Sequence, residues 1–218
     1  MTVLTAQTGF GGALLRDRTA EAQARTTRTD RSDIALSHPV DIFIGGCNDP
    51  RTRLVADYAR AHAARHPHRQ TAYFRQSQGR ALLRCLRALP RAARITVIAH
   101  SWGVPTACRA LARADRRVEL LVGVDPVNRN PLGLFREPDA LPDVRRILHV
   151  NAVGAAEHWD DGNAIARLGR FWCGGEPVLF RGAVRERIDA PFPHSCFAEM
   201  IAYRPDGGES AADIASRT

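Results

Sequence analysis

The chain has 218 residues, of which 44% are hydrophobic and 25% charged, and its formal net charge is +8. A chain of this length can bury a sizeable core as one domain, and its composition is typical of a globular protein, which excludes a disordered chain. All 31 basic residues are arginines, and they are spread along the sequence without a basic run that carries interleaved aromatics. The sequence therefore does not favour binding to nucleic acid.

The sequence gives no sign of a signal segment at residues 1–33 and no apolar run long enough to span a membrane. Its five cysteines are an odd number without metal-ligand spacing, which favours reduced thiols and synthesis in the cytoplasm. Export by a route without an N-terminal signal stays open, as does peripheral contact with acidic lipid headgroups. We expect no metal and no cofactor, and the oligomeric state is not defined.

In chain order, we expect a mobile or weakly structured leader at 1–33, one folded domain at 34–204 and a mobile tail at 205–218. Apolar runs within the domain predict strands at 40–44, 70–74, 95–99, 118–124 and 146–150, and a last one within 177–188. Helical spacing of apolar residues predicts helices at 50–66, 79–89, after 103, at 164–168 and at 197–203. A proline-rich stretch at 126–142 is expected to form a long loop or a cap. This alternation predicts an α/β fold with a mainly parallel sheet and helices on both faces.

The clearest functional signal is the sequence Ala-His-Ser-Trp-Gly, which lies between the strand predicted from Ile95 and the helix that follows it. Small residues, Ala99 and Gly103, stand two positions before and two positions after Ser101, as a sharp turn requires. Such a turn exposes the Ser101 hydroxyl over the edge of the sheet and directs the Trp102 N–H toward an oxygen bound beside it. An ordinary turn with a capping serine is the alternative.

This motif, in its strand–turn–helix setting, resembles the nucleophile elbow of the α/β-hydrolase superfamily, and the resemblance extends from about Val40 to Phe197. The departure is Ala99 in place of the first glycine, a replacement that some bacterial lipases of the superfamily share. The resemblance implies a single-domain α/β-hydrolase with a serine nucleophile. It also implies the chain order serine, acid, histidine for the catalytic triad.

A serine hydroxyl needs a base within hydrogen-bond reach, and that base needs an orienting carboxylate. In the superfamily the base lies late in the chain, where His194 is the only histidine after the last predicted strand, and His158 is its rival. For the acid, the sequence favours Asp125, which ends the strand after the elbow helix. Asp160 and Asp161, which follow the next strand, are the alternatives.

The other histidines are expected to have structural roles. His100 lies inside the elbow and should pack beside the turn, and His149 lies within a predicted strand. His62, His66 and His68 stand near the end of a predicted helix, without a carboxylate or cysteine partner nearby in the sequence. We interpret them as a solvated helix end and not as a metal site.

An oxyanion hole needs two hydrogen-bond donors. The Trp102 N–H is one, and the superfamily takes the second from the loop after an earlier strand. Here that loop contains Gly45 and Gly46, followed by Cys47, and two glycines let the backbone approach a substrate closely. The Cys47 N–H is the favoured second donor and Gly46 the next.

The predicted function is hydrolysis of a carboxylic ester or thioester, from a small molecule or a lipid, through an acyl-enzyme on Ser101. One alternative is a catalytically silent domain of the same fold that binds a ligand in the same pocket. Another is a basic protein that contacts nucleic acid or anionic lipid through its arginines. Because some lipase-like relatives are delivered as antibacterial toxins, a lipase-like toxin that acts on membrane lipids is a further alternative.

Overall fold

The computed structural model describes residues 4–5, 39–130, 134, 136–153, 161–181, 184 and 186–218, and for 4–5, 161–163 and 165 it describes only the backbone. The elements in chain order are β1 (Leu4–Thr5), β2 (Val40–Gly45), α2 (Asp49–Thr52), α3 (Leu54–Arg65), β3 (Gln70–Arg75), α4 (Gly79–Ala88), β4 (Ile95–His100), α5 (Gly103–Leu111), β5 (Leu120–Val124), β6 (Ile147–Ala152), α6 (Asp161–Trp172), the 3₁₀ helix η4 (Val178–Phe180), β7 (Glu186–Ala190), α7 (Phe197–Ala202), the 3₁₀ helix η5 (Pro205–Gly207) and α8 (Ala211–Arg217).

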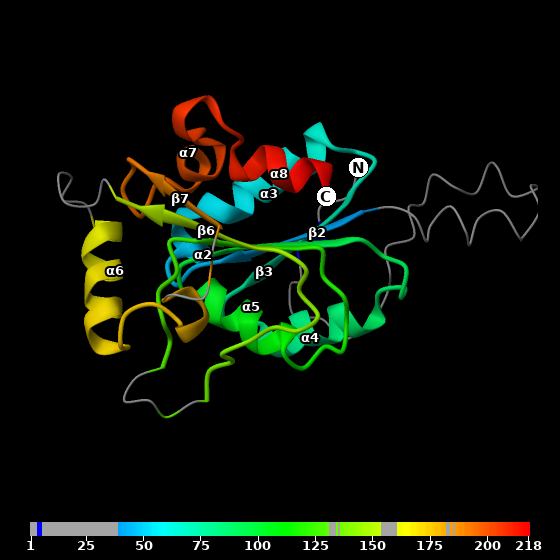
Figure 1. Ribbon diagram of the computed structural model, residues 1–218, viewed down its shortest axis with the longest axis horizontal. Coiled ribbons are helices and arrows are strands. Elements are labelled where there is room, and N and C mark those ends of the chain that lie inside the picture. The colour runs from blue at the N-terminus through cyan, green and yellow to red at the C-terminus, as the bar shows by residue number, and fades with distance from the viewer. Residues whose placement is uncertain are drawn as a thin grey trace, which may run out of the picture.

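The strands form one parallel sheet in the order β1-β3-β2-β4-β5-β6-β7. Helices α4 and α5 cover one face, and α3, α7 and α8 cover the other (Figure 1). Parallel strands need crossover connections, and helices supply those from β2 to β5 and from β6 to β7, so both faces of the sheet are covered. The predicted fold class, a single α/β domain with a mainly parallel sheet and helices on both faces, is confirmed, and this architecture is consistent with an α/β-hydrolase.

The central strand β4 is buried along its whole length, and its side chains alternate between two cores. Val97 and Ala99 pack in the core beneath α4 and α5, whereas Ile98 packs in the core beneath α3, α7 and α8. A strand that is buried on both faces reads as a continuous apolar run and not as an alternating one. The β-branched run that predicted this strand has this physical origin.

The segment that was predicted as one strand within 177–188 is instead the short helix η4 followed by β7. Leu179 and Phe180 of η4 are buried, and Phe180 lies directly over Gly123 of β5. A Cβ atom added to Gly123 would lie 2.6 Å from the Phe180 ring. The apolar side chains at 178–180 therefore face the core from a turn, and the strand begins later.

The expectation of a mobile tail at 205–218 is wrong, because this segment forms η5 and α8. The Ser210 hydroxyl accepts the N–H of Asp213, while the Asp213 carboxylate accepts the N–H of Ser210. This reciprocal cap starts α8, and Ile214 and Ala215 then pack in the core beneath α3 and α7.

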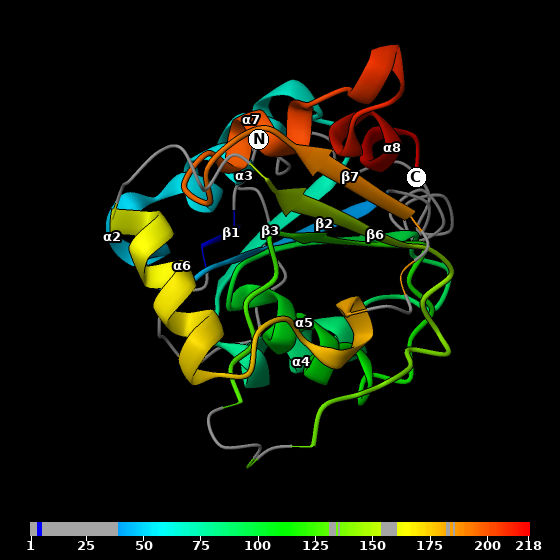
Figure 2. The ribbon, with the colours of Figure 1, turned by 60° about the vertical axis from the view of Figure 1, so that its left-hand side comes forward.

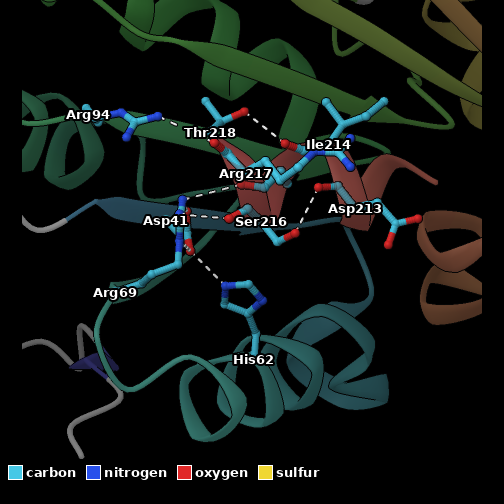
Figure 3. Close-up of polar contacts among 10 residues, drawn as sticks. Asp41, His62, Arg69, Arg94, Asp213, Ile214, Ser216, Arg217 and Thr218 are labelled. Atoms are coloured by element: carbon cyan, nitrogen blue, oxygen red, sulfur yellow. Dashed lines mark hydrogen bonds and ion pairs between the residues drawn. The ribbon is translucent and has the colours of Figure 1, made fainter. Parts of the chain in front are cut away.

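A buried ion-pair cluster fastens α8 to the beginning of β2 (Figure 3). The Asp41 carboxylate accepts hydrogen bonds from Arg69 at 2.6 and 2.7 Å and from His62 Nε2 at 2.7 Å. Arg69 also donates to the carbonyl oxygens of Ser216 at 3.3 Å and Ala215 at 3.4 Å. His62 is therefore a buried partner of Asp41, which corrects its interpretation as part of a solvated helix end, whereas His66 is half-buried and His68 exposed. The structure shows no metal-binding group of His, Cys, Asp or Glu within its described ranges.

Within the predicted leader, Leu4–Thr5 forms β1 and pairs with Ala72 and Tyr73 of β3. The rest of residues 1–33 lies outside the described residues. None of the helices in the described part of the chain is long and apolar enough to cross a membrane.

Candidate active site

The strand order places a topological switch point between the carboxyl ends of β2 and β4. From β2 the chain passes through α3, on one face of the sheet, to β3. From β3 it crosses back past β2 through α4, on the opposite face, to β4. The direction of the crossover reverses between these two neighbouring strands, and ligands of open α/β sheets bind at such a switch point. The loop after β2 carries Gly46 and Cys47, and the turn after β4 carries Ser101.

Ser101 occupies a left-handed conformation with φ +53°, immediately after β4 and before α5. A non-glycine residue in this region carries strain on the order of 1–3 kcal/mol, which the surrounding packing must hold in place. The Ser101 N–H donates to the Val124 carbonyl at 3.0 Å, and Gly103 packs against β2. A Cβ atom on Gly103 would lie 2.7 Å from the Ile44 carbonyl oxygen, so the turn requires glycine there. The sharp strand–turn–helix geometry predicted from the motif is present.

The loop after β2 lies directly against this turn. A Cβ atom added to Gly46 would lie 2.9 Å from the Ser101 Cβ. The buried Asp49 holds the loop, because its Oδ1 accepts the Val55 N–H at 2.7 Å and its Oδ2 accepts the Tyr73 hydroxyl. Sequence reasoning assigned no role in the site to Asp49 or Tyr73, which come from two different elements.

The two predicted oxyanion donors flank this contact between the loop and the turn. Trp102 immediately precedes α5, where the first N–H groups of a helix have no partner within the helix. Cys47 follows Gly46 and is half-buried, and burial raises the pKa of its thiol despite the opposing charge of Arg129. Because the thiolate is the nucleophilic form of cysteine, the Cys47 side chain is poorly suited to attack a substrate.

Asp125 and His194, which are 69 positions apart in the sequence, meet at the carboxyl edge of the sheet. Asp125 follows β5, is fully buried and has φ +41°. Its Oδ2 lies 2.5 Å from His194 Nδ1. A carboxylate accepts, so Nδ1 carries the proton and donates, which leaves Nε2 as the nitrogen that can take up a proton. The Ala152 N–H donates to Asp125 Oδ1 at 3.2 Å, and Arg170 donates to the same oxygen.

The surroundings of Asp125 keep its carboxyl group ionised. Burial alone would raise the pKa of this group, but the hydrogen bond and charge of His194, the charge of Arg170 and the Ala152 N–H outweigh that effect. Together they lower the pKa of Asp125 to about 2. The carboxylate thus carries its negative charge throughout the neutral range and can stabilise a protonated His194.

His100 links the His194 loop to the serine turn. Its ring stacks on the His194 ring with centroids 4.6 Å apart, and its Nε2 donates to the His194 carbonyl oxygen at 3.0 Å. Burial, with the neighbouring charge of His194, lowers the pKa of His100 to about 3, so this imidazole is neutral. His100 packs beside the turn, as the sequence predicted.

The alternative base and acid residues lie wholly or partly outside the described part of the chain. His158 and Asp160 lie outside the described residues, and Asp161 contributes the first backbone residue of α6 with its side chain outside the description. His149 lies buried in β6, where burial lowers its pKa to about 4, in keeping with the sheet position predicted for it.

Helix α6 lies at the end of the sheet toward which β6 points (Figure 2), and its residues Gly169 and Arg170 contact the candidate site. A Cβ atom on its Gly169 would lie 3.0 Å from Val127 and 3.2 Å from the Trp102 indole nitrogen. The next residue, Arg170, reaches Asp125. Sequence reasoning missed Arg170, since one arginine among 31 carries no local signal of its partner.

The comparisons with known proteins do not assign the chain to a family. No protein-family model matches the chain, and no curated protein matches it. A solved structure from Xanthomonas campestris pv. campestris, described as a "putative hydrolase of the alpha/beta superfamily", is similar in fold, with 16% sequence identity and a TM-score of 0.44. That similarity covers 76% of this chain and 93% of the other. We therefore base the function on the geometry of the site.

Proposed function

We propose that the protein is a serine hydrolase that cleaves a carboxylic ester or thioester through an acyl-enzyme on Ser101. The observation that carries the proposal is the hydrogen bond between Asp125 and His194 Nδ1 at the sheet edge where Ser101 stands in a left-handed turn. A buried carboxylate that fixes one tautomer of a histidine is the arrangement that a serine nucleophile needs. The strain stored at Ser101 supports a functional role for the turn.

In the first half of the reaction, the Ser101 Oγ attacks the carbonyl carbon of the ester while His194 Nε2 accepts the serine proton. Asp125 stabilises the resulting imidazolium and keeps its orientation. The carbonyl oxygen becomes an oxyanion, which accepts hydrogen bonds from the backbone N–H groups of Trp102 and Cys47, with Gly46 as the other candidate donor. The C–O or C–S bond then breaks, and His194 returns its proton to the leaving alcohol or thiol.

In the second half, His194 Nε2 takes a proton from water, and the hydroxide that forms attacks the acyl carbon. The tetrahedral intermediate collapses, the proton passes to Ser101 Oγ, and the carboxylic acid is released. Every proton transfer uses the same imidazole nitrogen, which is the one that Asp125 leaves available. The scheme needs no metal and no organic cofactor.

Covalent labelling by a fluorophosphonate tests the nucleophile directly. The wild-type protein should be labelled once, and Ser101→Ala should lose both the label and turnover of a chromogenic ester, by a factor on the order of 10⁶ in precedent. A screen over esters of increasing acyl length then defines the substrate. Retained labelling in a folded Ser101→Ala protein, checked by circular dichroism, would overturn the assignment.

A lipid ester is the substrate class that one further observation favours. Helix α6 packs on the candidate site with one side and exposes Leu168, Phe171 and Trp172 on the other, at 58%, 81% and 69% of their surfaces. Contiguous exposed apolar side chains beside a site are typical of contact with a membrane or a partner. Arg167 lies next to them on α6, which suits an anionic lipid surface.

Replacing Phe171 and Trp172 together by serine tests this extension. The double variant should lose sedimentation with anionic phospholipid vesicles and hydrolysis of a vesicle-borne ester, because apolar area that enters the bilayer drives such binding. Turnover of a short water-soluble ester serves as the control, since it needs no surface contact. Unchanged vesicle binding would remove membrane lipids from the proposed substrates and leave the soluble esters.

A further inference from the structure

A cleft of about 280 Å³ opens between α4 and α5 and is lined by four arginines. They come from three segments: Arg80 from the start of α4, Arg109 and Arg113 from α5, and Arg129 from the loop after β5. None of the described side chains that line the cleft is acidic, and the Ser77 hydroxyl adds a further donor. The cleft therefore presents a concentrated positive charge.

The four arginines are gathered in one cleft, and they have no carboxylate partners among the described ion pairs. Arginines such as Arg53, Arg146 and Arg187 make ion pairs with acidic side chains. An uncompensated cluster of this kind is expected where the compensating charge belongs to a ligand.

The electrostatic repulsion within this cluster is clearest at Arg109 and Arg129. Burial lowers the pKa of Arg109, and repulsion from Arg129 lowers it further, while Glu137 opposes both with a smaller effect. One terminal nitrogen of Arg109, Nη1, is buried and has no hydrogen-bond partner within the described part of the protein. A bound anion would supply that partner and relieve the repulsion between the two guanidinium groups.

Arg129 is held in position for this role. Its Nη1 donates to the side-chain oxygen Oε1 of Gln76 at 2.6 Å, and the backbone carbonyl oxygen of Gln76 accepts the Thr106 hydroxyl at 2.8 Å. Both of these partners line the cleft. The amino end of α4 opens on the same space, and its N–H groups and dipole favour negative charge.

The cleft is placed to receive part of a molecule whose ester reaches Ser101. Thr106 lies one helical turn beyond Trp102, and its hydroxyl is 3.4 Å from the Trp102 carbonyl oxygen. With a rise of about 1.5 Å per residue, Arg109 lies roughly 10 Å along α5 from Trp102. The reach of the Arg109 side chain, together with the bonds that separate a phosphate from an acyl carbonyl, can span that distance.

We propose that this cleft is a phosphate-binding subsite and that the substrate is an ester carrying a phosphate group, with Arg109 and Arg129 as its main ligands. The planar guanidinium matches phosphate oxygens in pairs, which favours phosphate over a spherical anion. The phosphate could belong to a lipid headgroup or to a soluble phosphoester. The substrate part of the proposal rests on the proposed hydrolase function, whereas the anion site does not.

Binding is measured first, in the Ser101→Ala protein so that turnover does not interfere. Calorimetric titration compares dibutyryl phosphatidic acid with dibutyrylglycerol, two soluble esters that differ only in the phosphate. Dibutyryl phosphatidic acid should bind more tightly, and adding Arg109→Gln or Arg129→Gln should weaken its binding by about 10- to 100-fold. Arg84→Gln, on the exposed side of α4, removes the same charge outside the cleft and should leave the affinity unchanged.

Turnover is measured next, as the ratio of kcat/KM for the phosphorylated ester to that for the neutral one. This ratio should fall by about 10- to 100-fold in Arg109→Gln and stay constant in Arg84→Gln. Long-chain phosphatidic acid in phosphatidylcholine vesicles distinguishes the two sources of the phosphate, a lipid headgroup and a soluble phosphoester. Its hydrolysis, with loss in Arg109→Gln, supports a lipid headgroup, whereas hydrolysis of the soluble ester alone supports a soluble phosphoester.

Two results would overturn the inference: equal affinity of the phosphorylated and neutral esters, or equal weakening by Arg109→Gln and Arg84→Gln. The proposed function can fail separately. Phosphate-dependent binding that requires Arg109, without labelling or turnover at Ser101, would keep the anion site and remove the hydrolase. Thermal melts check folding, and Arg109→Gln should not lower the melting temperature, since it removes a half-buried charge whose buried Nη1 has no hydrogen-bond partner among the described residues.

Discussion

Replacing Asp125 by asparagine changes one atom of the proposed triad and should nearly abolish turnover. Asp125 uses both carboxylate oxygens: Oδ2 accepts from His194, while Oδ1 accepts from the Ala152 N–H and Arg170. An asparagine side chain has the same shape but only one oxygen. That oxygen should stay with the two fixed donors, Ala152 and Arg170, and turn its NH₂ group toward His194 Nδ1.

The consequence is a change of tautomer at His194. Facing an N–H donor, Nδ1 must become the acceptor, and the ring proton moves to Nε2, the nitrogen that should take the proton of Ser101. In the serine-protease precedent this substitution lowers kcat by a factor on the order of 10⁴, or about 5.5 kcal/mol in the activation barrier. The fold should survive, because the amide fills the same volume and keeps the contact with Ala152.

The assay is kcat on one chromogenic ester for Asp125→Asn, with circular dichroism as the check on folding. Asp189→Asn is the matched control, because it makes the same change at a carboxylate whose partners, Arg187 and Asn151, lie on the surface. Asp160→Asn and Asp161→Asn should remain active. Near wild-type turnover in Asp125→Asn with a collapse in either of these two variants would refute the reasoning and move the acid to the later loop.

Two further substitutions test the loop beside Ser101 and the cluster beneath α8. Gly46→Ala should lower kcat by about 10- to 100-fold with little change in melting temperature. The Cβ of the new alanine would lie 2.9 Å from the Ser101 Cβ and displace an oxyanion donor. An unchanged kcat would contradict this. Asp41→Asn should lower the free energy of unfolding in urea by about 3–5 kcal/mol, because it leaves Arg69 buried without a carboxylate, whereas Asp57→Asn at an exposed pair should cost under about 1 kcal/mol. Burial raises the pKa of Asp41, but the hydrogen bonds and charges of Arg69 and His62 lower it below the ordinary value. The stabilising contribution of Asp41 is therefore present above about pH 4 and is lost as the pH falls further. This pH dependence should be missing from the unfolding free energy of Asp41→Asn.

The sequence predicted the elements whose signals are local. The run from Ile95 to Ile98 is β-branched and, apart from Thr96, apolar because β4 is buried on both faces, and the turn needs small residues because Gly103 touches the backbone of β2. Both requirements can be read within eleven residues. The same local logic fails at Val178–Phe180, because three apolar residues look alike in a strand and in a 3₁₀ turn that faces the core.

Helix α8 has a local sequence signal, although the composition of this segment favours a mobile tail. The spacing of Ser210 and Asp213, followed by Ile214, is that of a capping box before an apolar position. The surrounding residues are small and polar, which favoured a mobile tail. What stabilises the helix is tertiary, since Ile214 and Ala215 bury their side chains and Arg69 binds the last carbonyls.

Long-range partners mark the limit of sequence reasoning, and they explain why the site could be predicted only in part. An aspartate inside a buried strand, such as Asp41, signals that some partner exists, because an unpaired buried charge is too costly to keep. It does not identify that partner, and His62 and Arg69 are separated from Asp41 by 21 and 28 positions. The chain order that the resemblance implies narrows the choice of acid but leaves it open, because Asp125, Asp160 and Asp161 all lie between Ser101 and His194. The fold shows that Asp125 meets His194. Arg170 has no such external rule, so only the fold reveals that the helix packed on the site also binds the acid.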